Sequence, residues 1–246
     1  MVQKDTGWLR ALLDLMFPQC CCLSCGKNET TKSLGLCSKC LKDFDRLQEG
    51  YSSCSFCAAF VPENKNYCAN CFGEVFYWFD LARAVFPYEG GVKEILHRFK
   101  YRGMRNLARS LGILMQETLK KSYNYRKFDL VIPVPLHPSR LQERGYNQSE
   151  LLAREIARGL RIPLGESILV RHVNTPSQTG FGRTDRYLNL KKAFALTSKE
   201  SIRGKNVLLV DDIFTTGATT AACSRVLKKG GADYVFVIVF AAGKTH

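Results

Sequence analysis

At 246 residues, 46% of them hydrophobic, the chain is long enough to bury the core of one large domain or of two small ones. Its formal net charge of +14 predicts attraction to polyanions, whether nucleic acid, phosphorylated metabolites or an anionic surface. The apolar stretch 8–17 is too short to span a bilayer, is interrupted by Asp14 and precedes no small-residue cleavage site, which argues against a membrane span or a secretion signal.

Ten of the eleven cysteines lie in the first third of the chain, and only Cys223 lies beyond it. This asymmetry favours a local metal-binding module over a disulfide framework. Thiolates persist as metal ligands in a reducing compartment, so we expect a cytoplasmic protein. The change in composition places a domain boundary near Asp80, with a cysteine-rich domain at 1–80 and a second domain at 81–246.

The cysteines form a repeated pattern that is typical of zinc sites, because a Cys-x-x-Cys knuckle aims two sulfurs at one ion and two knuckles complete a tetrahedron. Eleven residues separate the first two pairs and ten the last two, which predicts two sequential structural zinc sites, with cross-braced pairing as the alternative. Cys20 and Cys21 crowd the first pair, either as substitute ligands or as bystanders. The expected ligands are Cys22, Cys25, Cys37, Cys40, Cys54, Cys57, Cys68 and Cys71.

Apolar runs and helical patterns alternate in the second region. Strands are expected at 83–87, 130–134, 169–173, 207–210 and 234–240, and helices at 92–99, 104–120, 148–159 and 218–229. This alternation predicts an α/β fold with a mainly parallel sheet and helices on both faces.

The stretch VLLVDDIFTTGATT, residues 207–220, carries the sharpest signal. Asp211 and Asp212 would emerge at the carboxyl end of a buried strand, where open α/β sheets bind ligands. A tight loop then enters a helix, so that backbone N–H groups, hydroxyls and the positive helix end converge on one anion. Two carboxylates beside a phosphate cradle describe a site for a ribose 5-phosphate. The loop residues are Thr215, Thr216, Gly217, Ala218 and Thr219.

Other nucleotide-binding motifs do not fit this chain. A strand that ends in Asp-Asp also occurs in P-loop ATPases, but the required G-x-x-x-x-G-K-[ST] sequence is absent. Gly243-Lys244-Thr245 imitates its tail, although Ile238 stands where the first glycine belongs. The Rossmann G-x-G-x-x-G sequence is missing as well.

Residues 207–219 resemble the phosphoribosyl-pyrophosphate (PRPP) signature of type I phosphoribosyltransferases. The PVPL sequence at 133–136, Arg140, the RGYNQ sequence at 144–148 and the multi-cysteine segment resemble the ComF family of competence proteins. So do Lys100-Tyr101 and a series between Arg171 and Phe194. The resemblance implies a type I phosphoribosyltransferase fold behind a double zinc-ribbon-like domain, PRPP binding and a link to natural transformation. It does not by itself imply turnover.

If PRPP binds, its pyrophosphate needs cations and Mg²⁺. Arg140 and Arg144 follow the strand at 130–134 and are expected to line the pyrophosphate loop, with Lys100 as a further candidate. The segment 174–186 is expected to form a hood over the sugar, with Arg183 and Arg186 at its tip, and a solvated loop is the alternative.

Between residues 91 and 127, ten lysines or arginines face only two glutamates. Four arginines recur there at helical spacing, and interleaved tyrosines offer stacking faces for single-stranded bases. This pattern predicts a surface for single-stranded DNA, with a solvated face or a pyrophosphate site as alternatives. The arginines are Arg98, Arg102, Arg105 and Arg109.

The pattern as a whole favours a protein that binds PRPP with Mg²⁺ and assists the uptake of single-stranded DNA, alongside other uptake machinery. An active phosphoribosyltransferase that releases pyrophosphate to an unidentified acceptor is the main alternative. A DNA-binding module with a vestigial pocket is the third hypothesis. Retention of PRPP and release of pyrophosphate distinguish the three.

Overall fold

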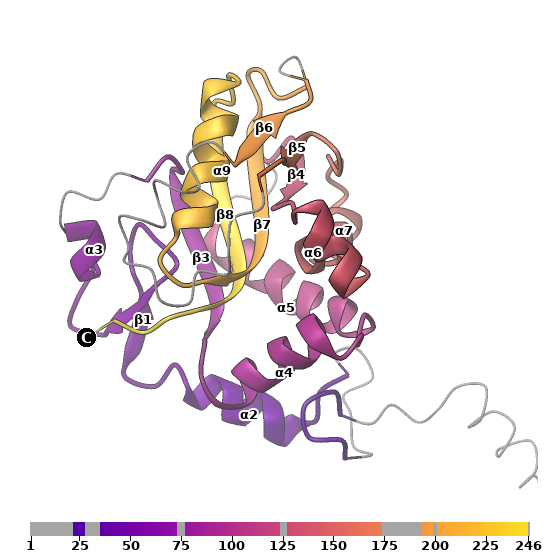
Figure 1. The fold of residues 1–246 in the computed structure, drawn as a ribbon. Coiled ribbons are helices and arrows are strands. Elements are labelled where there is room, and N and C mark those ends of the chain that lie inside the picture. Colours follow the sequence, from indigo (N-terminus) through magenta and orange to yellow (C-terminus); the bar gives the residue numbers. More distant parts are fainter. Residues whose placement is uncertain are drawn as a thin grey trace, which may run out of the picture.

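The computed structural model describes residues 22–27, 35–72, 77–123, 127–173, 193–198 and 201–245. Its centre is a parallel sheet in the strand order β3-β8-β7-β4 (Figure 1). The mainly parallel sheet that the sequence predicts is therefore confirmed. The strands are β3 (Leu81–Pro87), β4 (Leu130–Pro133), β7 (Asn206–Phe214) and β8 (Tyr234–Ala242).

The sheet separates two hydrophobic cores, because successive side chains of a strand point to opposite faces. In β7, Val207 and Leu209 belong to the core that contains α9. Leu208 and Val210 belong to the other core, which α4, α5 and α7 cover (Figure 1). Both faces are therefore covered by helices, as expected. The helices are α4 (Gly90–Tyr101), α5 (Leu107–Ser122), α7 (Gln148–Leu160) and α9 (Ala218–Lys229).

Strand β7 is longer than the sequence suggests. Its pairing with β8 continues as far as Phe214, which lies opposite Ala242. Asp211 and Asp212 therefore lie within the last part of the strand and not beyond its end, as the sequence led us to expect. The apolar residues Ile213 and Phe214 explain the extension, because they continue the strand pattern past the two carboxylates.

The strand pair β5-β6 and the short helix α6 lie outside the central sheet. The run expected as a strand at 169–173 is β5 (Leu169–Arg171), which pairs antiparallel with β6 (Phe194–Leu196) and forms a separate sheet. Helix α6 (Pro138–Arg144) was not expected from the sequence. Its Pro138 suits the first turn of a helix, and Gly145 ends it with a φ of 74°.

The first half of the cysteine-rich segment packs on the α4 and α5 side of the sheet. Helix α2 (Ser38–Arg46) lies beneath α4 in Figure 1, and Cys22, Cys37 and Cys40 share the core of that face. Arg98 of α4 donates a hydrogen bond to the carbonyl oxygen of Ser24 at 2.9 Å. A side chain of the second region thus holds the first cysteine loop in place.

The second half packs on the opposite face. It contains β1 (Tyr51–Ser53), β2 (Phe60–Pro62) and α3 (Ala69–Phe72), and its buried cysteines share the core that contains α9. Arg83 of β3 donates hydrogen bonds to the carbonyl oxygens of Cys54 and Ser55, at 3.1 and 3.2 Å. Each half of the cysteine-rich segment therefore shares a core with the sheet, and the division at residue 80 stays a prediction.

Residues far apart in sequence meet beside β2. The backbone N–H of Phe60 donates to the carbonyl oxygen of Gly243 at 3.0 Å, and the N–H of Thr245 donates to Phe60 at 2.8 Å. This parallel bridge lies just beyond the end of β8. Among the residues that the structure describes, no helix has both the length and the apolar character needed to cross a membrane.

Candidate functional site

A pocket of about 380 Å³ opens at the carboxyl end of the central sheet. Its walls come from the residues that follow β3 and β4, from the end of β7 and from the nearby ends of α4, α6 and α7. Carboxyl ends of parallel strands form the usual ligand site of open α/β sheets. The polar and aromatic lining residues are Tyr88, Lys100, Tyr101, Arg140, Arg144, Gln148, Ser149, Arg171, Asp211, Asp212, Thr215 and Thr219.

The two aspartates are held in different ways. Asp211 Oδ1 accepts a hydrogen bond from the Ser149 hydroxyl at 2.7 Å and one from the Asp212 backbone N–H at 3.0 Å. Asp212 Oδ2 lies 2.9 Å from the Lys100 ammonium, and both side chains are mostly buried. The carboxylates thus have fixed positions before any ligand enters.

Burial and charge set the protonation of this group of residues. Burial, together with the neighbouring Asp212 charge, raises the pKa of Asp211 to about 7, although the Ser149 hydrogen bond opposes the shift. For Lys100, burial lowers the pKa, but the charge and hydrogen bond of Asp212 together with the charge of Asp211 outweigh burial, and the net shift is upward. Near neutral pH Asp211 is therefore protonated in part of the molecules, beside the Lys100 cation.

Three arginines complete the cationic side of the pocket. Arg144 donates to Gln148 Oε1 at 3.2 Å and to the Tyr101 hydroxyl at 3.3 Å, and its guanidinium lies over the Tyr101 ring. Burial lowers the pKa of the Arg171 guanidinium, and the Arg140 charge lowers it further. Cations this close repel one another unless an anion compensates them, so the arrangement suits a multiply charged phosphate.

Residues 215–219, here called the phosphate loop, comprise the turn after β7 and the first two residues of α9. Gly217 has a φ of 75°, and a Cβ there would lie 2.4 Å from a Phe214 ring atom and 2.8 Å from a Tyr77 ring atom. Only glycine fits this position. The Thr220 hydroxyl donates to the Gly217 carbonyl oxygen at 3.0 Å, so the turn is closed from within. A second hollow, of about 20 Å³, is lined by the loop, the end of β7 and the first turn of α9.

The structure brings most of the expected ligand-binding residues together. Lys100, Arg140 and Arg144 line the same pocket as the aspartates, Thr215 and Thr219, whereas Thr216, Gly217 and Ala218 line the adjoining hollow. The expected hood residues Arg183 and Arg186 lie outside the described residues. Their roles remain predictions.

Several lining residues were not expected to belong to the site. Ser149 and Gln148 open α7 behind the N-cap Asn147, and Arg171 extends from β5. Polar residues at the start of α7 were the available signal, since they follow the RGYNQ sequence directly. Arg171 begins the series that resembles the ComF family, but nothing in the sequence assigned it or Tyr88 to the pocket, because both reach it through the pairing of distant strands.

The four arginines expected to bind DNA do not share one helix. Arg98 belongs to α4, Arg102 and Arg105 to the connection after it, and Arg109 to α5. Arg98 is bonded to the first cysteine loop and paired with Glu94. Arg105 donates to the Gly145 carbonyl oxygen at 2.9 Å. The helix break at Gly103, where φ is 66°, thus distributes the charges over a surface beside the pocket.

The eight cysteines form two groups of four in sequential order. Within each group the sulfurs lie within 4.8 Å of one another. Cys25 and Cys37 sulfurs are 3.7 Å apart in the first group, and Cys57 and Cys68 sulfurs are 3.6 Å apart in the second. A tetrahedral ion with metal–sulfur bonds of about 2.3 Å requires sulfurs about 3.8 Å apart, so both groups fit zinc. Sequential grouping is confirmed, and the cross-braced alternative is wrong.

A family profile described as a phosphoribosyl transferase domain matches residues 147–246, which include the start of α7, the aspartates and the phosphate loop. Together with the parallel sheet and the helices on both its faces, this match defines the class: the fold is that of the type I phosphoribosyltransferases. The cysteine-rich segment is an addition to that fold and is compatible with two zinc ribbons.

Relatives cover most of the chain. Competence protein F of Haemophilus influenzae is 33% identical over 221 residues, which cover 88% of this chain and 94% of that protein. Competence protein ComFC of Bacillus subtilis is 36% identical over 154 residues, 62% of this chain and 60% of that protein. The DNA utilization protein YhgH of Salmonella typhimurium is 29% identical over 206 residues, 82% of this chain and 88% of that protein. This chain belongs to the ComF family.

The pKa of Asp211 predicts a pH-dependent contribution to stability. Because its folded value of about 7 exceeds the ordinary 3.8, the folded protein keeps a proton that the unfolded chain releases. The free energy of unfolding should therefore fall as pH rises from about 4 to about 7. Asp211→Asn removes this decline. The free energy of unfolding of the variant, relative to that of the wild type, should therefore rise by about 1–3 kcal/mol from pH 5 to pH 8, measured by urea unfolding.

Asp233→Asn supplies the control, because it removes one carboxylate from an exposed turn and leaves Asp211 in place. It should keep the wild-type decline. A parallel pH profile in Asp211→Asn and wild type would show that Asp211 is ionised throughout.

Proposed function

We propose that this protein binds PRPP with Mg²⁺ in the pocket at the carboxyl end of the sheet, holds two structural zinc ions, and binds single-stranded DNA. The observation that carries the proposal is the convergence of two aspartates, the phosphate loop and four cationic side chains on one pocket. The printed names of its relatives, which refer to competence and DNA utilization, support a role in natural transformation or in the use of external DNA.

The sugar-phosphate half of the ligand matches one side of the pocket. Asp211 and Asp212 present carboxylate oxygens to vicinal hydroxyls, and the phosphate loop presents N–H groups and hydroxyls beside them. The partial proton on Asp211 and the Lys100 cation reduce the repulsion that two bare carboxylates would exert on a phosphate. The site therefore accepts hydroxyls and an anion side by side.

The pyrophosphate half matches the cationic residues that line the same pocket. Arg140, Arg144 and Arg171 surround the space beside Lys100, and Arg144 is held in place by Gln148 and Tyr101. A preorganised guanidinium loses little entropy when it binds a phosphate. Mg²⁺ would neutralise the charge that remains on the pyrophosphate.

A surface for single-stranded DNA follows from the charges between α4 and α5. Arg102 and Arg109 are exposed, and Arg105 is exposed as well although its guanidinium contacts Gly145 and the Tyr146 ring. Arg98 is committed to the first cysteine loop, so we assign it a structural contact in addition to the expected DNA role. The remaining three offer charges to a phosphate backbone next to the mouth of the pocket.

Turnover of PRPP is the second candidate function. The observation that favours it is the antiparallel pair of β5 and β6, which brings Arg171 to the pocket from outside the central sheet as a further cation for the pyrophosphate. Release of pyrophosphate in the presence of PRPP and Mg²⁺ distinguishes an enzyme from a binding protein.

The proposal for PRPP predicts that Asp212→Asn weakens binding at least tenfold in a calorimetric titration with PRPP and Mg²⁺, because a carboxylate acceptor for the sugar hydroxyls is lost. Gly217→Val should abolish binding, since its side chain would overlap Phe214 and Tyr77. Asp233→Asn makes the same change in charge away from the pocket and should bind as wild type. Unchanged affinity in both Asp211→Asn and Asp212→Asn would remove the sugar-hydroxyl role.

The proposal for zinc predicts about two zinc ions per chain by metal analysis of the purified protein. Cys22→Ser should leave about one ion and destabilise the α2 side, and Cys71→Ser should leave about one and destabilise the β1–β2 side. Cys223→Ser lies outside both groups and should keep both ions. A fully folded preparation without metal would contradict the assignment.

The proposal for DNA predicts that the double variant Arg102→Ala, Arg109→Ala binds single-stranded DNA more weakly, because two exposed phosphate contacts are lost. The slope of log affinity against log salt should fall by roughly 0.7 for each contact. The matched control is Arg154→Ala with Arg158→Ala, which removes the same charge from α7 and should bind as wild type. If the first pair loses PRPP instead and keeps DNA, these arginines belong to the pyrophosphate site.

A further inference from the structure

The second cysteine group lies against the central sheet through the knuckle of Cys54 and Cys57. The backbone N–H of Ala82 in β3 donates to the carbonyl oxygen of Phe56 at 2.9 Å. The Arg83 side chain donates to the carbonyl oxygens of the two preceding residues, Cys54 and Ser55. Phe56 stands between the two expected ligands, so the position of its ring depends on the geometry of the metal site.

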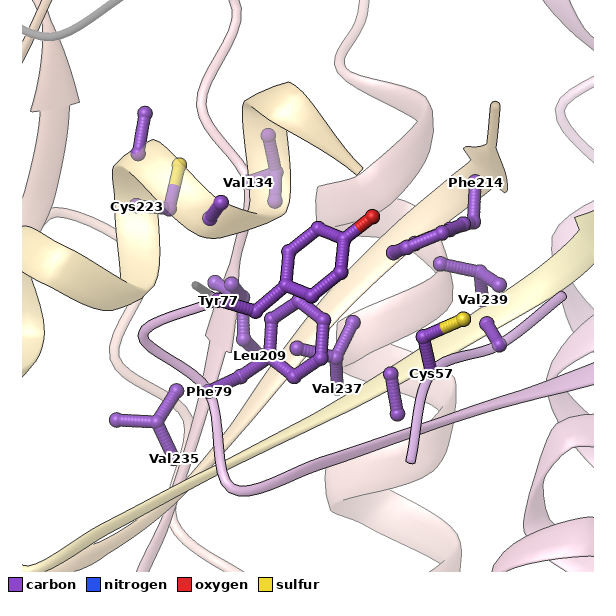
Figure 2. Close-up of a cluster of buried hydrophobic side chains, with 14 of the residues drawn as sticks. Cys57, Tyr77, Phe79, Val134, Leu209, Phe214, Cys223, Val235, Val237 and Val239 are labelled. Atoms are coloured by element: carbon purple, nitrogen blue, oxygen red, sulfur yellow. The ribbon is translucent and has the colours of Figure 1, made fainter. Parts of the chain in front are cut away.

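The Phe56 ring begins a continuous aromatic cluster. Its centroid lies 5.5 Å from that of Phe79 and 6.1 Å from that of Tyr77, and the Tyr77 and Phe79 rings stack at 4.8 Å. The rings of Tyr77 and Phe79 also contact the ring of Phe214 at the end of β7, each with a centroid distance of 6.2 Å. Figure 2 shows Tyr77 and Phe79 beside Phe214, with Cys57 close to them. Rings at such spacings favour fixed mutual orientations.

The cluster ends directly on the phosphate loop. The Tyr77 hydroxyl donates to the backbone carbonyl oxygen of Thr216 at 3.2 Å. Gly217 sits so close to the Tyr77 and Phe214 rings that a Cβ would overlap both. Tyr77 therefore holds the backbone of the phosphate loop through its hydroxyl, and its ring contacts Phe56 of the metal knuckle.

We infer that Tyr77 is a positioning residue that links the second zinc site to the phosphate loop, so that an ordered metal knuckle sets the affinity for a sugar phosphate. This inference rests on the proposed binding of a ribose 5-phosphate group. The knuckle fixes Phe56, Phe56 fixes the Tyr77 ring, and the Tyr77 hydroxyl fixes the Thr216 carbonyl. A preorganised loop binds its anion more tightly because less backbone entropy is lost on binding.

The first cysteine group has no corresponding contact with the phosphate loop among the described residues. Its cysteines pack on the opposite face of the sheet, where Phe44 contacts Phe86 at 5.5 Å, and its link to the second region runs through Arg98 of α4. The two groups should therefore differ in function although they share one geometry. Loss of the first should cost stability, and loss of the second should also cost anion affinity.

The test is a calorimetric titration with ribose 5-phosphate, which lacks the pyrophosphate. Tyr77→Phe removes only the hydroxyl and should weaken binding about 3–10-fold, the effect of one lost hydrogen bond. Phe56→Leu keeps all the cysteines and should weaken binding by a similar or larger factor while the zinc content stays at the wild-type value. Phe44→Leu, beside the first group, should change affinity less than about twofold.

Amide hydrogen exchange of residues 216–220 in the ligand-free protein gives a second measurement, which Tyr77→Phe should accelerate and Phe44→Leu should not. If Phe56→Leu fails to fold, amide exchange in Tyr77→Phe still tests the link between the zinc site and the phosphate loop. If wild type binds ribose 5-phosphate and Tyr77→Phe matches it in both affinity and exchange, the link is overturned and the proposed function stands. If wild type binds neither ribose 5-phosphate nor PRPP, both are overturned.

Discussion

The pairing of β7 between β4 and β8 is the interaction on which the rest of the structure depends. Strand β7 pairs with β8 from Asn206 to Phe214 and with β4 over residues 207–210, and its alternate side chains fill two separate cores. The strand can therefore carry two carboxylates near its end without moving them, because the four residues directly before them, 207–210, are buried. The start of α7 reaches these carboxylates through Ser149, and the end of α4 reaches them through Lys100.

The pocket shows how a protein can place acidic and anion-binding groups next to each other. Two adjacent carboxylates would repel a phosphate, but one is paired with a lysine and the other has a pKa of about 7. The arginines that line the same pocket therefore add positive charge that these carboxylates only partly offset. The same carboxylates still present oxygen acceptors, so recognition of hydroxyls and attraction of an anion coexist.

Particular residues show what the sequence could and could not predict. The sequence of residues 207–219 predicted the positions of the aspartates and of the phosphate loop, because the apolar strand, the carboxylates and the glycine form a pattern within one short segment. The spacing of the cysteines likewise predicted two sequential groups. Local patterns could not place Arg171, Ser149 or Tyr77, since each reaches the site through tertiary packing. The basic run at 91–127 predicted the charge, and the separate helices expected at 92–99 and 104–120 match the break around Gly103, but the sequence did not predict that Arg98 and Arg105 make contacts within the protein.

The bridge between Phe60 and residues 243–245 has a consequence for the order in which the chain is made. The ribosome makes the hairpin of β1 and β2 long before it makes residues 243–245, which pair with Phe60 of that hairpin. Before β8 and the residues after it have been made, the hairpin lacks its backbone partner at 243–245. The sheet face that buries the second group of cysteines is also incomplete at that stage. Four thiols capable of binding metal are thus present early on an unfinished chain, and the rest of the sheet must arrive before they are enclosed.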